Sequence, residues 1–156
     1  MKRRIIISSI ITLLIDILTK FGIERYFELS ESKIIIPNFF SLTKVYNYGV
    51  SFSMLNNERY IIILITLVVF GMLIAYAKKF KNNFRNSLMF GLLFGGIIGN
   101  LINRIFLGYV IDFLDFKIFG YNYPVFNIAD ICIVFGVMLM IYAIIKKEDV
   151  NENSSR

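Results

Sequence analysis

Two aspartates, Asp112 and Asp130, are the residues of this chain best suited to chemistry. The sequence has no histidine, which excludes Ser-His and Cys-His nucleophile pairs. Two carboxyl groups that share a low-dielectric site cannot both ionise readily, so the pKa of one rises and the pair offers an acid beside a base. Such a pair can take a proton from a water that attacks a carbonyl and return a proton to the leaving amine. These residue types therefore favour hydrolysis of the aspartic type.

The elements that must position these carboxylates are membrane helices. Of the 156 residues, 57% are hydrophobic, well above the usual share in soluble domains. Crossing a hydrocarbon core of about 30 Å takes about 20 residues of helix. Four segments are long and apolar enough: 5–23, 60–77, 87–107 and 125–145. We read the first as a retained helix rather than a signal peptide, because its apolar run is long, contains Asp16 and is followed by Lys20 instead of a small-residue cleavage site.

The placement of basic residues sets the predicted orientation. Within the net charge of +6, basic residues cluster before the first segment, between the second and third, and after the fourth. By the positive-inside rule those three sites and both termini are cytoplasmic. Residues 24–59 and 108–124 then form outer loops, and Asp112 lies in the second loop. The β-branched and aromatic stretches 33–36 and 39–46 of the first loop predict a small extracytoplasmic sheet. The sequence thus predicts an all-α membrane protein with a small β-subdomain over 1–147, and a disordered cytoplasmic tail over 148–156.

Three of the apolar segments carry a polar pair spaced three or four residues apart, which places each pair on one helix face. In the predicted orientation every pair lies near the outer end of its segment: Asp16 with Lys20, Asn100 with Arg104, and Asn127 with Asp130. A charged side chain at membrane depth costs at least about 2.5–3.5 kcal/mol and is retained mainly where it pairs or functions. We therefore expect one polar site near the outer leaflet.

Several roles are open for the residues around the two carboxylates. Ion pairs such as Asp16 with Lys20, or Arg104 with either catalytic candidate, can simply lock helix packing, and Asn100 can bridge helices. Asn47, Asn127 or Arg104 can stabilise an oxyanion or hold the carboxyl groups in place. A small proton- or ion-coupled carrier would also use outer-leaflet carboxylates, although the inner halves of the segments lack the charges that it would need. The pair Gly95 and Gly99 predicts close helix packing.

Five stretches together resemble the bacterial lipoprotein signal peptidases, the signal peptidase II family, over about residues 5–145. In chain order they are "DILTK" (16–20), "NYGVSFS" (47–53), "GGIIGNLINR" (95–104), "GYVIDFLDF" (108–116) and "FNIAD" (126–130). The resemblance implies an aspartyl endopeptidase of the bacterial inner membrane, active on its extracytoplasmic side. Such an enzyme removes signal peptides from prolipoproteins by cleaving before a diacylglyceryl-modified cysteine, without metal or cofactor.

The resemblance also implies roles for particular residues. It makes Asp112 and Asp130 catalytic, and it assigns supporting positions to Asp16, Lys20, Asn47, Asn100, Arg104 and Asn127. The expected partners are lipid-modified prolipoproteins and membrane lipids, with no nucleic acid, and we expect a monomer. The chain departs from the family pattern at Asn103, where most members have aspartate, and this removes a charge next to Arg104.

Overall fold

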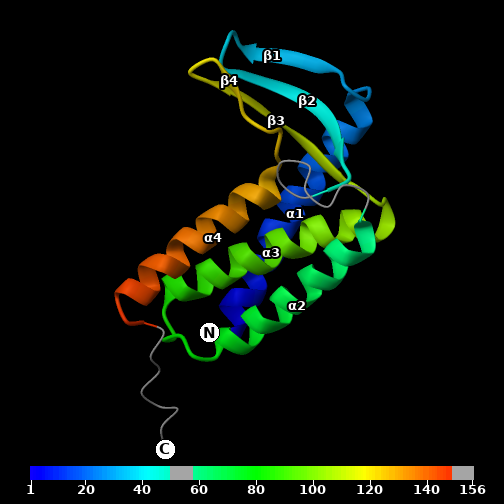
Figure 1. Cartoon of the computed structure of the whole chain (residues 1–156). Helices are drawn as coiled ribbons and strands as arrows, with labels where there is room; N and C mark the ends of the chain where they lie inside the picture. Colours follow the sequence, from blue (N-terminus) through cyan, green and yellow to red (C-terminus); the bar gives the residue numbers. More distant parts are fainter. Residues whose placement is uncertain (50–57, 149–156) are drawn as a thin grey trace, which may run out of the picture.

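The computed structural model describes residues 1–49 and 58–148 (Figure 1). This part of the chain contains four helices that are long and apolar enough to span a membrane. They are α1 (Lys2–Tyr26), α2 (Arg59–Ala77), α3 (Phe84–Phe106) and α4 (Ile128–Ile145). The four predicted helices are confirmed, with ends shifted by a few residues. Part of the outer loop, including "VSFS" of the second motif, and nearly all of the predicted tail lie outside the described residues.

The helices lie side by side, and the sheet caps one end of them (Figure 1). A hydrophobic cluster at the opposite end joins all four helical segments: Ile5, Ala77, Phe90 and Ala143, with Phe80 from the turn between α2 and α3. The start of α1 and the end of α4 therefore lie at the same end of the bundle, away from the sheet.

Helices α1 and α3 approach closely through the predicted glycine pair. A β-carbon built on Gly95 would lie 2.6 Å from Cβ of Thr12 and 2.7 Å from the Ser9 carbonyl oxygen, and one on Gly99 would collide with the Asp16 carboxylate. Both distances are too short for real carbon contacts. The prediction of close packing is confirmed, and it brings the polar face of α1 against that of α3.

We expect Gly95→Ala to destabilise the protein by about 1–3 kcal/mol, because the added methyl group overpacks this contact. Gly71→Ala is the matched control, since a β-carbon on Gly71 meets nothing within 4 Å. That substitution should be neutral or slightly stabilising, because alanine is the better helix former. Thermal unfolding in detergent micelles measures both, and equal melting temperatures would contradict the close contact.

The sheet has four antiparallel strands in the order β1-β2-β3-β4. They are β1 (Ser32–Ile36), β2 (Phe40–Asn47), β3 (Val110–Ile118) and β4 (Tyr121–Asn122). The first two confirm the predicted sheet, but the expectation that Asp112 lies in a loop is wrong. Asp112 lies in β3, opposite Val45 of β2. The residues Val110–Ile118 are mostly β-branched or aromatic, which favours a strand. This strand forms backbone pairs with the edge of β2 that β1 does not occupy.

The sheet is fixed to the end of α1 by Lys44. Its buried ammonium donates to the carbonyl oxygens of Glu24 (3.2 Å) and Phe27 (3.0 Å) and forms an ion pair with Glu24 at 3.1 Å. The last carbonyls of a helix have no helical partner and carry partial negative charge, so a cation is stabilising there. This contact sets the position of β2, and through it that of β3 and Asp112.

Candidate active site

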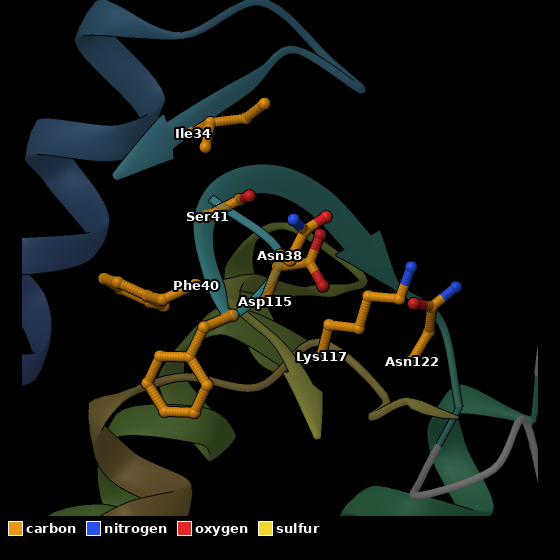
Figure 2. Close-up of a pocket in the computed structure, with 8 residues that line it drawn as sticks. Ile34, Asn38, Phe40, Ser41, Asp115, Lys117 and Asn122 are labelled. Carbon is orange, nitrogen blue, oxygen red and sulfur yellow. The ribbon is translucent and has the colours of Figure 1, made fainter. Parts of the chain in front are cut away.

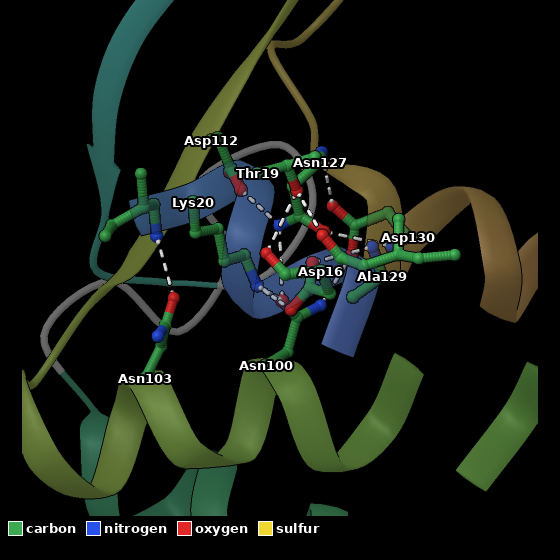
Figure 3. A network of polar contacts seen from close by, with 11 residues as sticks. Asp16, Thr19, Lys20, Asn100, Asn103, Asp112, Asn127, Ala129 and Asp130 are labelled. Atoms are coloured by element: carbon green, nitrogen blue, oxygen red, sulfur yellow. Dashed lines mark hydrogen bonds and ion pairs between the residues drawn. The ribbon is translucent and has the colours of Figure 1, made fainter. Parts of the chain in front are cut away.

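The N-terminus of α4 joins the two candidate catalytic aspartates (Figure 3). Asn127 caps this helix, because its side-chain oxygen accepts from the Asp130 N–H at 3.0 Å while the Asp130 carboxylate accepts from the Asn127 N–H at 3.1 Å. The same side chain donates its amide to Asp112 at 2.6 Å. A capping box normally serves only the helix end. Here it also places one residue in contact with both carboxylates.

Asp112 is held from two sides. One carboxylate oxygen accepts from Asn127, and the other accepts from the side-chain amide of Asn47 at 2.8 Å. Asn47 lies opposite Val110 on the neighbouring strand, so it is a diagonal neighbour of Asp112 on the same face of the sheet. The two amides that were predicted either to stabilise an oxyanion or to hold the carboxyl groups therefore hold Asp112.

The Asp112 carboxyl is almost completely buried, at 2% exposure. Burial, and then the nearby charge of Asp130, raise the pKa of Asp112 from its ordinary value of 3.8 to about 7, while the hydrogen bonds from Asn47 and Asn127 oppose the rise. At neutral pH this carboxyl can therefore hold a proton. The pair then contains an acid beside a carboxylate.

We expect the cleavage rate to fall as pH rises above about 7, approaching tenfold per pH unit, because Asp112 loses the proton that the reaction uses. Because the folded state holds this proton more tightly than the unfolded chain, the stability it contributes is lost between about pH 4 and 7. Rates at saturating substrate across pH measure the first effect, and melting temperatures measure the second. A rate that stays level to pH 9 would contradict the assignment.

Asp130 lies where negative charge is favoured. It is in the first turn of α4, at the positive end of the helix dipole. Its carboxylate accepts from the side-chain amide of Asn100 at 2.8 Å as well as from the Asn127 N–H. These donors hold the Asp130 carboxylate at the start of α4, beside the residue that also contacts Asp112.

Lys20 and Asp16 are buried beneath the two candidate catalytic aspartates, between α1, α3 and α4. The Lys20 ammonium lies 2.8 Å from the Asp16 carboxylate and donates to the Asn100 side-chain oxygen, also at 2.8 Å. The other Asp16 oxygen accepts from the N–H of Ala129 in α4 at 3.0 Å. This predicted ion pair is therefore present, and it is also connected to Asp130 through Asn100. The contacts that join α1, α3 and α4 thus also reach a candidate catalytic carboxylate.

Arg104 is placed differently from the other predicted residues. It donates to the carbonyl oxygen of Gly49 at 2.9 Å and forms no salt bridge with Asp112 or Asp130 in the described structure. The proposed pairing of this arginine with a catalytic aspartate is therefore wrong. Its contact instead fixes the chain two residues after Asn47.

Asn103 has a role that sequence reasoning missed. Its side-chain oxygen accepts from the Ile111 N–H at 3.3 Å, directly before Asp112, and its carbonyl accepts from Leu107 and Gly108 where α3 ends. The amide thus links α3 to the start of β3. An asparagine can make this contact as well as an aspartate, without adding another carboxylate to the site. The residue type alone gave no signal for a bond to the backbone.

We expect Asn103→Leu to lower the maximal cleavage rate by about tenfold, because a buried N–H loses its acceptor and β3 is no longer held next to Asp112. Asn103→Asp keeps an acceptor and should retain more activity than the leucine variant. Steady-state kinetics with both variants test this. If leucine and aspartate have equal effects, the contact with Ile111 does not position Asp112.

A separate depression lies on the sheet and contains none of the predicted site residues (Figure 2). Its polar lining comes from the turn between β1 and β2 and from β2, β3 and β4: Asn38, Ser41, Asp115, Lys117 and Asn122. The Asp115 carboxylate accepts a hydrogen bond from Thr43 at 2.8 Å. The predicted residues are thus gathered around Asn127 rather than here.

The sequence also matches a known family. The family model described as signal peptidase (SPase) II matches residues 8–146. The chain belongs to this family. A lipoprotein signal peptidase of Halothermothrix orenii is 40% identical over 146 residues, which cover 94% of this chain and 98% of that protein. Another from Haemophilus influenzae is 39% identical over 147 residues, covering 90% of this chain and 84% of the relative.

Solved structures agree with this membership of the signal peptidase II family. A bacterial membrane enzyme determined by the in meso method at 2.3 Å resolution superposes with a TM-score of 0.83 at 32% identity. The match covers 91% of this chain and 87% of that one. A second, at 1.9 Å resolution, has a TM-score of 0.80 at 32% identity and covers 91% and 92%. The chain therefore shares the fold of these bacterial membrane enzymes.

Proposed function

We propose that this chain is an intramembrane aspartyl endopeptidase that removes signal peptides from prolipoproteins by cleaving before a diacylglyceryl-modified cysteine. Asp112 and Asp130 are its catalytic residues, and the reaction needs no metal or cofactor. The observation that carries this assignment is the contact of one residue, Asn127, with both carboxylates. Membership of the signal peptidase II family favours this function over the carrier alternative.

The proposed reaction uses one proton on the pair. The Asp130 carboxylate takes a proton from the attacking water, while Asp112 gives its proton to the carbonyl oxygen of the scissile bond. In the resulting tetrahedral species, Asp130 returns its proton to the amine nitrogen as the carbon–nitrogen bond breaks. A hydroxyl proton passes back to Asp112 as the new carboxyl group forms. Asn47 and Asn127 hold Asp112 in one orientation throughout.

In the proposed arrangement both termini are cytoplasmic and the site faces the extracytoplasmic side of the bacterial cell membrane. The basic turn between α2 and α3 supports this orientation, since Lys78, Lys79 and Lys81 lie at the end of the bundle away from the sheet. Leu18 and Phe21, exposed near the outer end of α1, are suited to contact with lipid chains. We propose a monomer over residues 1–147.

Cleavage of a diacylglyceryl-modified prolipoprotein by the purified protein tests the function. The matched substrate carries the same sequence with an unmodified cysteine and should be cut far more slowly. Mass spectrometry of the products places the cleaved bond. Proton uptake by vesicles that contain the protein tests the carrier alternative, and transport without cleavage would overturn the proposal.

A further inference from the structure

The turn between β3 and β4 places a phenylalanine where the backbone disfavours it. Ile118 pairs with Tyr121, so Phe119 and Gly120 form a two-residue hairpin loop. Both have positive φ, 49° at Phe119 and 82° at Gly120. Such loops strongly prefer Asn-Gly, because bulky side chains are unfavourable at positive φ. The backbone conformation at Phe119 therefore costs conformational free energy.

Nothing in the described structure offsets that cost. The Phe119 side chain is fully exposed, at 106% of its reference area, so its ring packs against no other group. A side chain that destabilises its own turn and gains no internal contact is best explained by a contact outside the chain.

Other exposed apolar side chains surround this turn. The turn between β1 and β2 lies next to it, because the Lys117 N–H donates to the Phe39 carbonyl oxygen at 2.9 Å. Figure 1 shows both turns together at the end of the sheet that lies above α4. We call the exposed apolar residues of the two turns the hairpin tips: Ile36, Phe39, Ile118, Phe119 and Tyr121.

The chemistry of the hairpin tips matches a membrane interface. Tyrosine rings suit the depth of the lipid headgroups, phenylalanine rings bury at the boundary between headgroups and acyl chains, and basic side chains attract anionic lipids there. Lys117, one residue before the tips, is exposed and supplies that charge. The nearest acidic side chain on the same strand, Asp115, is hydrogen-bonded to Thr43. The chain is an integral membrane protein whose sheet caps the ends of its helices, so a lipid surface lies beside this part of the molecule.

We propose that the hairpin tips insert into the headgroup region of the membrane and anchor the free end of the sheet. The same strand, β3, carries Phe119 at its turn and Asp112 near its other end. Anchoring the tips therefore fixes the depth and tilt of the strand that presents Asp112 to a membrane-embedded substrate. This proposal depends on the membrane location of the chain and not on its peptidase activity.

Site-specific fluorescence in lipid vesicles tests the insertion. In a Cys132→Ala background, Phe119→Cys is labelled with an environment-sensitive dye and reconstituted in phosphatidylethanolamine and phosphatidylglycerol. Asn122→Cys is the matched control, since Asn122 lies on the same hairpin but lines the polar depression (Figure 2). Dye at 119 should emit at shorter wavelength and be quenched by nitroxide lipids labelled near the headgroup, whereas dye at 122 should not.

Two results would overturn the proposal. Dye at 119 that is as water-exposed as dye at 122 would show that the tips do not reach the lipid. A shift at 119 that appears only when prolipoprotein is added, or only at high protein density, would assign the tips to the substrate or to a second copy of the chain.

A substitution separates anchoring from folding. Phe119→Asn suits the turn better, so its melting temperature in micelles should equal or exceed that of the wild type. In vesicles we expect KM to rise by about threefold to tenfold with kcat unchanged, since loss of aromatic burial weakens the alignment of the sheet with the membrane. An unchanged KM in vesicles, or an equal rise in micelles, would contradict a membrane anchor.

Discussion

Asp112→Asn and Asp130→Asn should each lower the cleavage rate by at least about 10²–10⁴-fold while the protein remains folded, because each removes a proton-transfer group from the reaction. Asparagine preserves the shape of the side chain. At position 112 its amide oxygen can still accept one of the two hydrogen bonds now supplied by Asn47 and Asn127. Single-turnover cleavage of a diacylglyceryl-modified prolipoprotein in micelles measures the loss.

Thermal unfolding shows whether a variant that has lost activity is still folded, and for Asp112→Asn it also has a predicted dependence on pH. The pKa of Asp112 is raised, so the wild type loses stability as this carboxyl ionises towards pH 7, whereas Asp112→Asn lacks that loss. The difference in melting temperature should therefore favour this variant more at pH 8 than at pH 5. Asp115→Asn, an exchange on the same strand away from the site, is the control and should remain active. Normal cleavage by either catalytic-site variant would exclude the carboxylate pair.

The parts of the site that the sequence predicted are those encoded in residue type and helical spacing. Hydrophobic segments of helix length predicted α1 to α4. Polar residues at helical spacing predicted the depth at which Asp16 and Asn100, joined by Lys20, lie beside Asp130. The preference of Asn127 for a helix start is likewise local. These predictions did not depend on knowing which segments of the chain are in contact.

The missed contacts join backbone groups to side chains distant in sequence. Arg104 binds a carbonyl at Gly49, Asn103 binds the N–H of Ile111, and Asp16 binds the N–H of Ala129. Every residue has a backbone N–H and carbonyl, so residue type does not reveal which one is used. The strand β3 was missed for a related reason. Its pattern of β-branched and aromatic residues was present, but its pairing with β2 depends on the position at which α3 ends.

Lys20→Met should produce the largest loss of stability among the supporting residues, about 3–5 kcal/mol, because it leaves the buried Asp16 carboxylate without its cation. The control is Lys33→Met, whose ion pair with Glu31 at 3.5 Å is exposed to solvent and should contribute little to stability. Equilibrium unfolding in detergent measures both. A loss at position 20 no larger than at position 33 would contradict a buried, closely paired ammonium.

A double variant then separates packing from support of the site. Lys20→Met combined with Asp16→Asn removes both charges, so much of the lost stability should return. Turnover should not return with it. In the wild type the Asn100 side-chain oxygen accepts from the Lys20 ammonium at 2.8 Å and from the Asn127 amide at 3.2 Å, which leaves the amide of Asn100 to donate to Asp130. Without the ammonium only the longer hydrogen bond from Asn127 opposes rotation of the Asn100 amide, and rotation would present its oxygen to the Asp130 carboxylate, which removes a donor and adds repulsion. Recovery of stability and turnover together would show that the ion pair serves packing alone, whereas recovery of stability alone would show that Lys20 orients the catalytic carboxylate through Asn100.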